Sequence, residues 1–176
     1  WGVTPKLTLD LTANTDFSQV EVDAEQVNLT RFSLFFPEKR DFFLENEGTF
    51  AFEDVSVRNF RTGSSNRKFR LFHSRRIGLS PSREPLPILA GARMTGRIGE
   101  QWEVGLINMQ TRSVLGPEDG ASFDAENFSV ARVKRHLSGG SNIGAMFVNR
   151  QSTGLSGRPA EFNRAYGIDG NFNVLP

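Results

Sequence analysis

Hydrophobic and polar side chains alternate unevenly along five stretches in the second half of the chain, roughly residues 90–98, 102–112, 128–137, 142–150 and 165–174. The second and fourth stretches are mixed. In the last stretch, Tyr166 and Ile168 fall on one side of an extended chain, whereas Asp169 and Asn171 fall on the other. A period of two is typical of β-strands, because successive side chains point to opposite faces of the sheet. Residues 6–17 show the same pattern, with Leu alternating against Thr and Asp. We therefore predict a strand in each of these stretches.

The connections between the predicted strands come in two lengths. Gly99 and Glu100 form one short connection, and Gly139 and Gly140 lie in another, where a two-residue turn requires positive φ. The sequences LGPEDGASFDAEN and STGLSGRPAEFN are longer connections, rich in Gly, Pro and Ser. Short turns that alternate with long loops predict hairpins in one antiparallel sheet.

Two fold classes share this pattern. A soluble antiparallel sheet with one covered face alternates in this way. So does an outer-membrane β-barrel, whose strands run for about 9 to 11 residues with apolar side chains outward and polar side chains inward. The periodicity leaves both classes open. The length of 176 residues suffices for one domain with a sizeable core.

The first half contains a stretch of different character. Residues 23–37 predict a short helix, with Asp23 as N-cap, Gln26 completing a capping box and Pro37 as the stop. The sequence FFPEKRDFFLENEGTF, from Phe35 to Phe50, overlaps its end and packs two Phe pairs around four charged residues. It fits neither a regular helix nor a regular strand. So much apolar surface must be buried against another part of the protein.

Charge is distributed unevenly along the chain, although the net charge is only +1. Residues 1–54 carry eleven acidic and four basic side chains, whereas residues 55–83 carry eight basic side chains and no acidic one. We expect the two segments to neutralise each other inside the fold, with two separate solvated surfaces as the alternative. Bases alternate with aromatic residues in NRKFRLFHSRR, but no nucleic-acid-binding motif surrounds it, so we predict no nucleic-acid partner.

The composition limits the candidate chemistry. The chain has no Cys, which excludes disulfides and thiolate metal sites. His73 and His136 lie far apart in sequence, so we predict no metal site and no cofactor. Glu38, Glu45 or Glu47 could supply a carboxylate pair for glycoside hydrolysis. With eleven acids in this region, some pair always lies at a suitable distance, so catalysis is not the favoured function.

Three strings occur together in this chain: DFSQVE at residues 16–21, FFPEKRDFFLE at 35–45 and SRRIG at 74–78. In this combination, and in order from about Leu7 to Asn173, the chain resembles the bacterial family called domain of unknown function 5916. NFSVARVKR at 127–135 adds to the resemblance. Members look like Gram-negative envelope proteins in which a family 9-like carbohydrate-binding domain precedes a large outer-membrane barrel. No catalytic residues are established for the family, so none is carried over.

The resemblance implies an all-β fold, an antiparallel transmembrane-type β-barrel segment with a short helical or irregular Phe-rich plug or periplasmic element. The plug would contain Phe35, Phe36, Glu38, Lys39, Arg40, Phe42, Phe43 and Glu45. Its counterpart would be a basic segment with Arg70, Arg75 and Arg76. The chain, 1–176, would be a single domain within a larger barrel, divided into an acidic strand plus plug (1–54), a basic segment (55–83) and hairpin strands (84–176).

The implied function is binding or transport in the bacterial outer membrane, with glycans as the ligand. The partners would be outer-membrane lipid, glycan, the N-terminal carbohydrate-binding domain and the remaining barrel strands. Candidate ligand-binding residues are Asp169 and Asn171, with an aromatic platform from Trp102 or Tyr166. Arg40, if buried, needs carboxylate or backbone-carbonyl partners. A soluble β-rich binding module and a membrane-associated glycan hydrolase are the alternatives.

Overall fold

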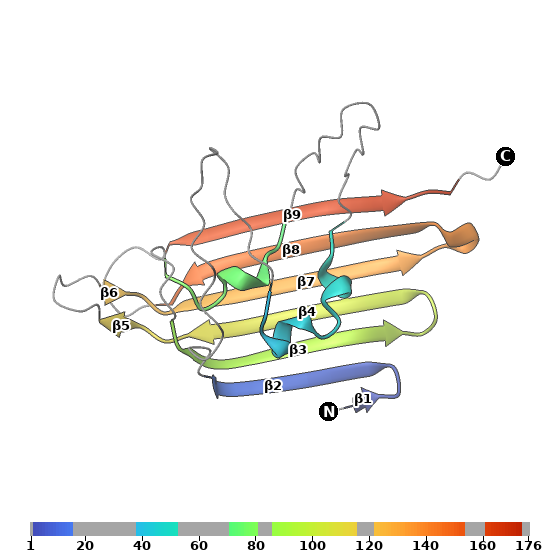
Figure 1. The fold of residues 1–176 in the computed structure, drawn as a ribbon. Coiled ribbons are helices and arrows are strands. Elements are labelled where there is room, and N and C mark those ends of the chain that lie inside the picture. Colours follow the sequence, from blue (N-terminus) through green and yellow to red (C-terminus); the bar gives the residue numbers. More distant parts are fainter. Residues whose placement is uncertain are drawn as a thin grey trace.

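One antiparallel sheet organises the computed structural model, which describes residues 2–15, 38–52, 71–80, 86–115, 122–153 and 161–173 (Figure 1). Its strand order is β1-β2-β3-β4-β7-β8-β9. The strands are β1 (Gly2–Thr4), β2 (Leu7–Thr15), β3 (Ile88–Ile98), β4 (Trp102–Thr111), β7 (Glu126–His136), β8 (Asn142–Ser152) and β9 (Phe162–Asn171). β5 (Val114–Leu115) and β6 (Ser122–Phe123) form a separate two-stranded ribbon. A strand is present in each predicted stretch, although β9 begins and ends three residues before the predicted 165–174, and the predicted positions 16, 17 and 174 lie outside the described residues.

The sheet is mostly a meander, and it is open. Among the described strands, β1 and β9 lie at opposite edges and do not pair with each other, so the described residues form no closed barrel. The short connections β3–β4 and β7–β8 lie at one end of the strands, and the long connections lie at the other end (Figure 1). Gly99, Gly139 and Gly140 have positive φ in the two short turns, as the turn chemistry predicts.

The register divides the side chains of the sheet between two faces. The first, which we call the charged face, carries Asp10, Arg93, Thr95, Glu103, Arg132, Lys134 and Asp169, together with the buried Ile107, Met109, Phe128, Val130 and Met146. The second, which we call the open face, carries Leu7, Leu9, Leu11, Ala92, Met94, Val104, Leu106, Ala131, Val133, Ala145, Phe147, Tyr166 and Ile168. This division follows the alternation of the sequence.

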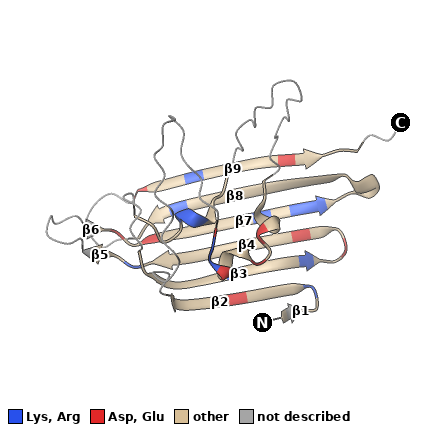
Figure 2. Ribbon diagram, viewed as in Figure 1, with Lys and Arg blue, Asp and Glu red and all other residues tan. Residues whose placement is uncertain are grey.

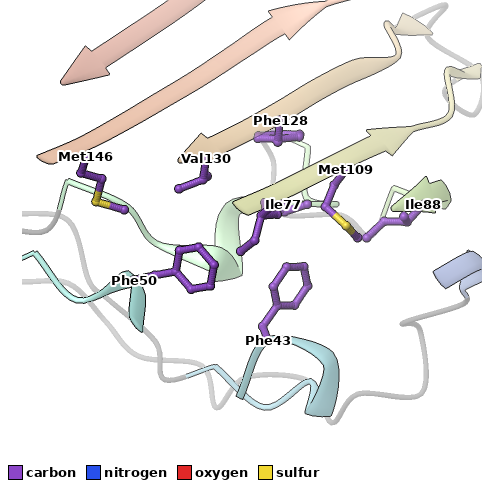
Figure 3. Close-up of a cluster of buried hydrophobic side chains, with 9 residues drawn as sticks. Phe43, Phe50, Ile77, Ile88, Met109, Phe128, Val130 and Met146 are labelled. Carbon is purple, nitrogen blue, oxygen red and sulfur yellow. The ribbon is translucent and has the colours of Figure 1, made fainter. Parts of the chain in front are cut away.

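A segment of the long β2–β3 connection packs on the charged face. We call residues 38–52 the covering segment; it contains the helix α1 (Asp41–Leu44) and the 3-10 turn η1 (Glu47–Phe50) (Figure 1). A second turn of the same connection, η2 (Ser74–Arg76), lies beside it. Phe43, Phe50 and Ile77 from these segments point toward the strand side chains (Figure 3). The buried core therefore lies between the covering segment and the charged face.

Two glycines of the charged face leave room for aromatic rings. A Cβ added at Gly105 would lie 2.8 Å from the ring of Phe50, and one added at Gly167 would lie 2.6 Å from the ring of Phe52. Gly105 and Gly167 lie in one row across the strands, with Arg132 and Met146 between them. The small residues therefore let the end of the covering segment rest directly on the sheet backbone.

The helix predicted for residues 23–37 lies outside the described residues. Within the described ranges, the helical elements are short, namely α1, η1, η2 and η3 (Ser138–Gly140). None of the described helices has the length and hydropathy needed to cross a membrane.

Candidate functional site

Arg93 joins the covering segment to the sheet. It lies on β3 directly opposite Asp10 of β2, and its side chain is 1 % exposed. Its Nη2 donates to Asp10 Oδ2 at 2.7 Å and to Glu45 Oε2 at 2.8 Å, and its Nε donates to Asp10 Oδ2 at 3.2 Å. Its Nη1 donates to the backbone carbonyls of Phe42 and Glu45. All five guanidinium N–H groups are therefore used in holding two carboxylates and one backbone turn.

Arg40 forms a second buried centre inside the covering segment. Its Nε and Nη2 each donate at 2.8 Å to the two oxygens of Glu38. Its Nη1 and Nη2 donate at 2.7 Å to the carbonyls of Ile77 and Ser74, and its guanidinium lies 4.3 Å from the centre of the Phe43 ring. The carboxylate and carbonyl partners predicted for Arg40 are confirmed. Here the charge is stabilised on its edges by oxygen and on its face by an aromatic ring.

The Glu38 carboxyl is held in its ionised form. Burial by itself raises its pKa, but the hydrogen bond and positive charge of Arg40 and the hydroxyl of Ser74 outweigh burial. The pKa of Glu38 therefore falls from 4.5 to about 2. Ser74 Oγ donates to Glu38 Oε2 at 2.6 Å, and Arg75 Nη1 lies 4.0 Å from Glu38 Oε1. A general acid for glycoside hydrolysis needs a raised pKa, so Glu38 does not fit that role.

Arg132 forms a third centre near the far edge of the sheet. It lies on β7, is fully buried, and donates from Nη1 and Nη2 to the two oxygens of Asp169 on β9, at 2.5 and 2.6 Å. The pair reaches across β8 at Gly144, where an added Cβ would lie 2.8 Å from Arg132 Nη1. The Phe52 ring of the covering segment lies 5.5 Å from the guanidinium carbon. A glycine in the intervening strand thus makes this cross-strand pair possible.

Acidic and basic residues lie on the strands and on the covering segment (Figure 2). Two centres, Arg93–Asp10 and Arg132–Asp169, join residues that are distant in sequence, whereas Arg40–Glu38 is a local pair inside the covering segment. Burying an ion costs several kcal/mol unless each charge is paired and hydrogen-bonded. Here each arginine has a carboxylate partner, and the carboxylates come from β2, β9 and the covering segment. The arrangement fixes the covering segment in one position on the sheet.

The structure places the predicted plug residues as follows. Glu38, Lys39, Arg40, Phe42, Phe43 and Glu45 all belong to the covering segment. Phe35, Phe36 and Arg70 lie outside the described residues. Of the basic segment, Arg75 approaches Glu38 at 4.0 Å, whereas Arg76 is exposed. Among the described residues, Arg93 of β3 pairs with two acidic side chains, Asp10 and Glu45, so the sheet also neutralises acidic residues of the first segment.

The predicted ligand-binding set does not form one cluster. Trp102 and Tyr166 lie on the open face, whereas Asp169 and Asn171 lie on the charged face. Tyr166 and Asp169 are separated by an odd number of positions in one strand, so their side chains must point to opposite faces. Asp169 is already bound by Arg132. The register therefore places the predicted aromatic platform on the opposite face of the sheet from these two polar residues.

Sequence reasoning missed Arg93, Asp10 and Arg132 as anchors. The sequence signal that could have identified such an anchor is a charged residue in the middle of a predicted strand. Asp10, which shares a face with Thr8 and Thr12, is an example. Such a residue needs a partner when its face is covered. Among the described residues, no group of three or more His, Asp or Glu side chains has the arrangement of a metal site.

Comparison with known proteins identifies the family of the chain. No curated protein and no solved structure matches it. The domain of unknown function DUF5916 matches residues 1–113, which include β1 to β4 and the covering segment. The string at 127–135, which the sequence analysis assigned to the same resemblance, lies beyond this match. Because the match spans more than half of the 176 residues, the chain belongs to the DUF5916 family.

Proposed function

We propose that this chain is a segment of a bacterial outer-membrane β-barrel with a binding or transport role in the cell envelope. Its open face contacts lipid, and its charged face, with the covering segment, faces the barrel interior. The observation that carries the proposal is the contrast between the two faces. The charged face and the covering segment on it bury three Arg–carboxylate centres, whereas no Asp or Glu occupies a described position of the open face.

The open face exposes many large apolar side chains. Its exposed large side chains include Leu11, Trp102, Leu106, Val133, Ile143, Phe147, Tyr166 and Ile168. They lie on β2, β4, β7, β8 and β9, and Ala92 and Met94 of β3 lie between those of β2 and β4 in one band. Monomeric soluble proteins rarely expose contiguous apolar patches larger than a few hundred Å². Exposure of such a band to water is unfavourable, and contact with lipid would remove this cost because hydrocarbon would replace water beside the apolar side chains.

Strand length and connection length also support the proposal. The six long strands contain 9, 11, 10, 11, 11 and 10 residues. A strand that crosses the bilayer at a tilt needs about 9 to 11 residues. Outer-membrane barrels have short turns at one end and long loops at the other, and the connections of this sheet are divided in the same way.

The open sheet requires further strands to complete a barrel. β9 pairs with β8 on one side only, among the described residues, and its backbone can accept another antiparallel strand on the other side. We propose that the neighbouring strand comes from polypeptide outside this chain. Glycans are the proposed ligand class, and the support for them is the carbohydrate-binding domain that accompanies the family in the resemblance described above.

Site-directed spin labelling tests the assignment of the faces. The chain has no Cys, so Val133→Cys and Lys134→Cys each give one labelling site on adjacent positions of β7. In lipid nanodiscs, we expect the label at 133 to collide with oxygen, which dissolves in lipid, and the label at 134 to collide with a water-soluble nickel chelate. Equal aqueous access at both sites, with a chain that stays monomeric without detergent, would establish the soluble binding module instead.

A further inference from the structure

The open face carries two arginines, and they lie at opposite ends of its apolar band. Arg135 lies at the end of the short turns, directly opposite Trp102, and its guanidinium carbon lies 5.4 Å from the centre of the Trp102 ring. Arg164 lies toward the long connections, and its guanidinium carbon lies 4.6 Å from the centre of the Phe162 ring. Both aromatic rings are exposed. Each end of the band thus presents a cation stacked on an aromatic ring.

The described positions of this face provide no carboxylate for either arginine. Arg164 donates from Nε to Asn149 Oδ1 at 3.1 Å, which orients the guanidinium. Its two terminal nitrogens have no hydrogen bond to a described residue. On the charged face and in the covering segment, in contrast, Arg93, Arg132 and Arg40 are each bound by a carboxylate. The open-face arginines therefore suit an anion that comes from outside the chain.

The side chains of the open face between the rows of Arg135 and Arg164 are apolar. The rows between them contain Val104, Val133, Ala145 and Ile168, followed by Leu106, Ala131, Phe147 and Tyr166. Gly170, in the Arg135 row, and Arg164 are six positions apart on β9, which corresponds to about 20 Å along a strand. Arginine side chains extend toward the polar region when their stems lie in hydrocarbon. The two guanidinium groups can therefore reach the two borders of an apolar layer about 25 Å thick.

A hydrogen-bonded row of amides marks the border at the long connections. Asn108 donates to Asn127 Oδ1 at 3.2 Å and to Ser129 Oγ at 2.9 Å, and Asn127 donates to Gln110 Oε1 at 3.3 Å. Gln110 continues the row by donating to Thr153 Oγ1 at 2.7 Å. Because these amides satisfy one another, they can lie beside lipid at a reduced desolvation cost.

A shallow apolar hollow of about 410 Å³ begins at this amide row. Leu9, Met94, Leu106 and Phe147 line it, and Asn108 and Ser129 lie at its polar end. Ala92 and Ala131 contribute small side chains that keep it open. An apolar hollow next to polar amides matches an amphipathic molecule, with its acyl chain along the hollow and its headgroup beside the amides.

From this arrangement we propose that Arg135–Trp102 and Arg164–Phe162 are two lipid-phosphate contact sites, one for each leaflet of the bilayer. The occupant is a membrane phospholipid with net negative charge, held by a guanidinium–phosphate pair and by the aromatic ring at headgroup level. This inference rests on the proposed function, because it requires the open face to contact lipid. It adds the depth of the sheet in the membrane and the two residues that recognise the headgroups.

Lipid selectivity at the protein surface tests the arginines. The chain is reconstituted in phosphatidylcholine bilayers that contain spin-labelled phosphatidylglycerol or spin-labelled phosphatidylcholine, and the motionally restricted fraction of each label is measured by electron paramagnetic resonance. We expect the anionic label to be preferred at the protein surface. Arg135→Gln and Arg164→Gln each lower this preference, by up to about fivefold at the altered site, and the double variant removes it. Arg97→Gln, an exposed arginine on the charged face, leaves it unchanged.

The depth of Trp102 provides a second test. In a Trp1→Phe background, Trp102 is the remaining tryptophan of the chain. We expect its fluorescence to be quenched more by a nitroxide at the headgroup than by one deep in the acyl chain. The matched control, Leu106→Trp with both native tryptophans replaced by Phe, shows the reverse order, because position 106 lies within the apolar band.

The outcomes separate this inference from the proposed function. If neither label shows a restricted component and no lipid nitroxide quenches Trp102, the sheet does not contact lipid and both proposals are wrong. If lipid contact is present but the two arginine variants keep the full anionic preference, or if deep nitroxides quench Trp102 best, only the phosphate-contact proposal is overturned.

Discussion

The burial of two neighbouring residues of β7 is the reverse of what is usual in a soluble protein. Arg132 is fully buried on the charged face, whereas Val133 is 38 % exposed on the open face. Soluble sheets bury valine and leave arginine in water. The same reversal occurs on β3, where Arg93 is buried and its neighbours Ala92 and Met94 line the hollow of the open face. The comparison teaches that this fold buries arginine–carboxylate pairs together with its hydrophobic core, whereas large apolar side chains are exposed on the open face.

The two faces achieve stability by different means. On the charged face, each buried arginine needs specific partners at fixed distances, so the loss of one partner leaves an unpaired charge. On the open face, the exposed apolar side chains of the band depend on no hydrogen-bond partner, and in the proposed membrane setting contact with lipid would replace their contact with water. Substitutions should therefore have local and large effects on the charged face, and effects that depend on the surrounding medium on the open face.

The largest effect is expected at Arg93. Arg93→Met removes five hydrogen bonds and leaves Asp10 without its cation, so we expect a loss of about 3 to 5 kcal/mol in the free energy of unfolding. Urea unfolding in detergent micelles measures it. Arg97→Met, on the same strand and face but exposed, is the control and should change the value by about 0.5 kcal/mol or less. Similar small effects for both variants would show that the covering segment does not depend on Arg93.

Arg40 tests whether geometry or charge matters in the covering segment. Arg40→Lys keeps the charge but loses the two-point contact with Glu38 and the contact with the Phe43 ring, so we expect it to destabilise by about 3 kcal/mol, nearly as much as Arg40→Ala. Lys39→Ala provides the adjacent comparison, with a mild effect. Thermal unfolding of the three variants measures the order. Full stability of Arg40→Lys would mean that any cation suffices at this position.

Leu106 tests the open face in the same way. Leu106→Arg puts a charge within the apolar band, and we expect it to reduce stability in lipid vesicles by about 2 to 4 kcal/mol. Asn108→Arg, two positions along the same face in the amide row, should cost about 0 to 1 kcal/mol because it lies near the membrane border. Unfolding titrations in vesicles measure both. Equal effects at the two positions would contradict a lipid-facing band.

Gly105 tests how closely the covering segment packs on the sheet. Gly105→Ala places a methyl group 2.8 Å from the Phe50 ring and from the Thr49 methyl group, so we expect a loss of about 1 to 3 kcal/mol. Gly48→Ala, in the covering segment itself, meets no atom within 4 Å and serves as the control. Thermal unfolding distinguishes them. If Gly105→Ala is as mild as Gly48→Ala, the ring of Phe50 can move away from the sheet without cost.

The most gradual effect is a change of stability with pH that depends on Glu38. The folded-state pKa of Glu38 is lowered to about 2 from 4.5, so its stabilisation is fully present above pH 4.5 and is lost as pH falls from 4.5 toward 2. One such group contributes at most about 1.4 kcal/mol per pH unit in this window. The stability difference between the wild type and Glu38→Gln should narrow over this range. A constant difference down to pH 2 would mean that folding does not lower the pKa of Glu38.

The sequence by itself determined the strands, the short turns and the division into two faces. This was possible because alternation is a local property: each residue's face follows from its position relative to its neighbours in the same strand. Gly99 and Gly139 likewise specified turns through their own backbone conformations. The pairing of the covering segment's Arg40 was also predictable in kind, since a buried arginine needs oxygen partners.

Only the tertiary structure decided which residues meet. Arg93 binds Asp10 and Glu45, which are 83 and 48 positions away in sequence, and Arg132 reaches Asp169 because Gly144 leaves space between them. The register of the sheet also separated Tyr166 from Asp169, although both were candidates for one ligand site. Contacts of this kind depend on how distant strands align and on which side chains leave room, and neither property is written in the local alternation of the chain.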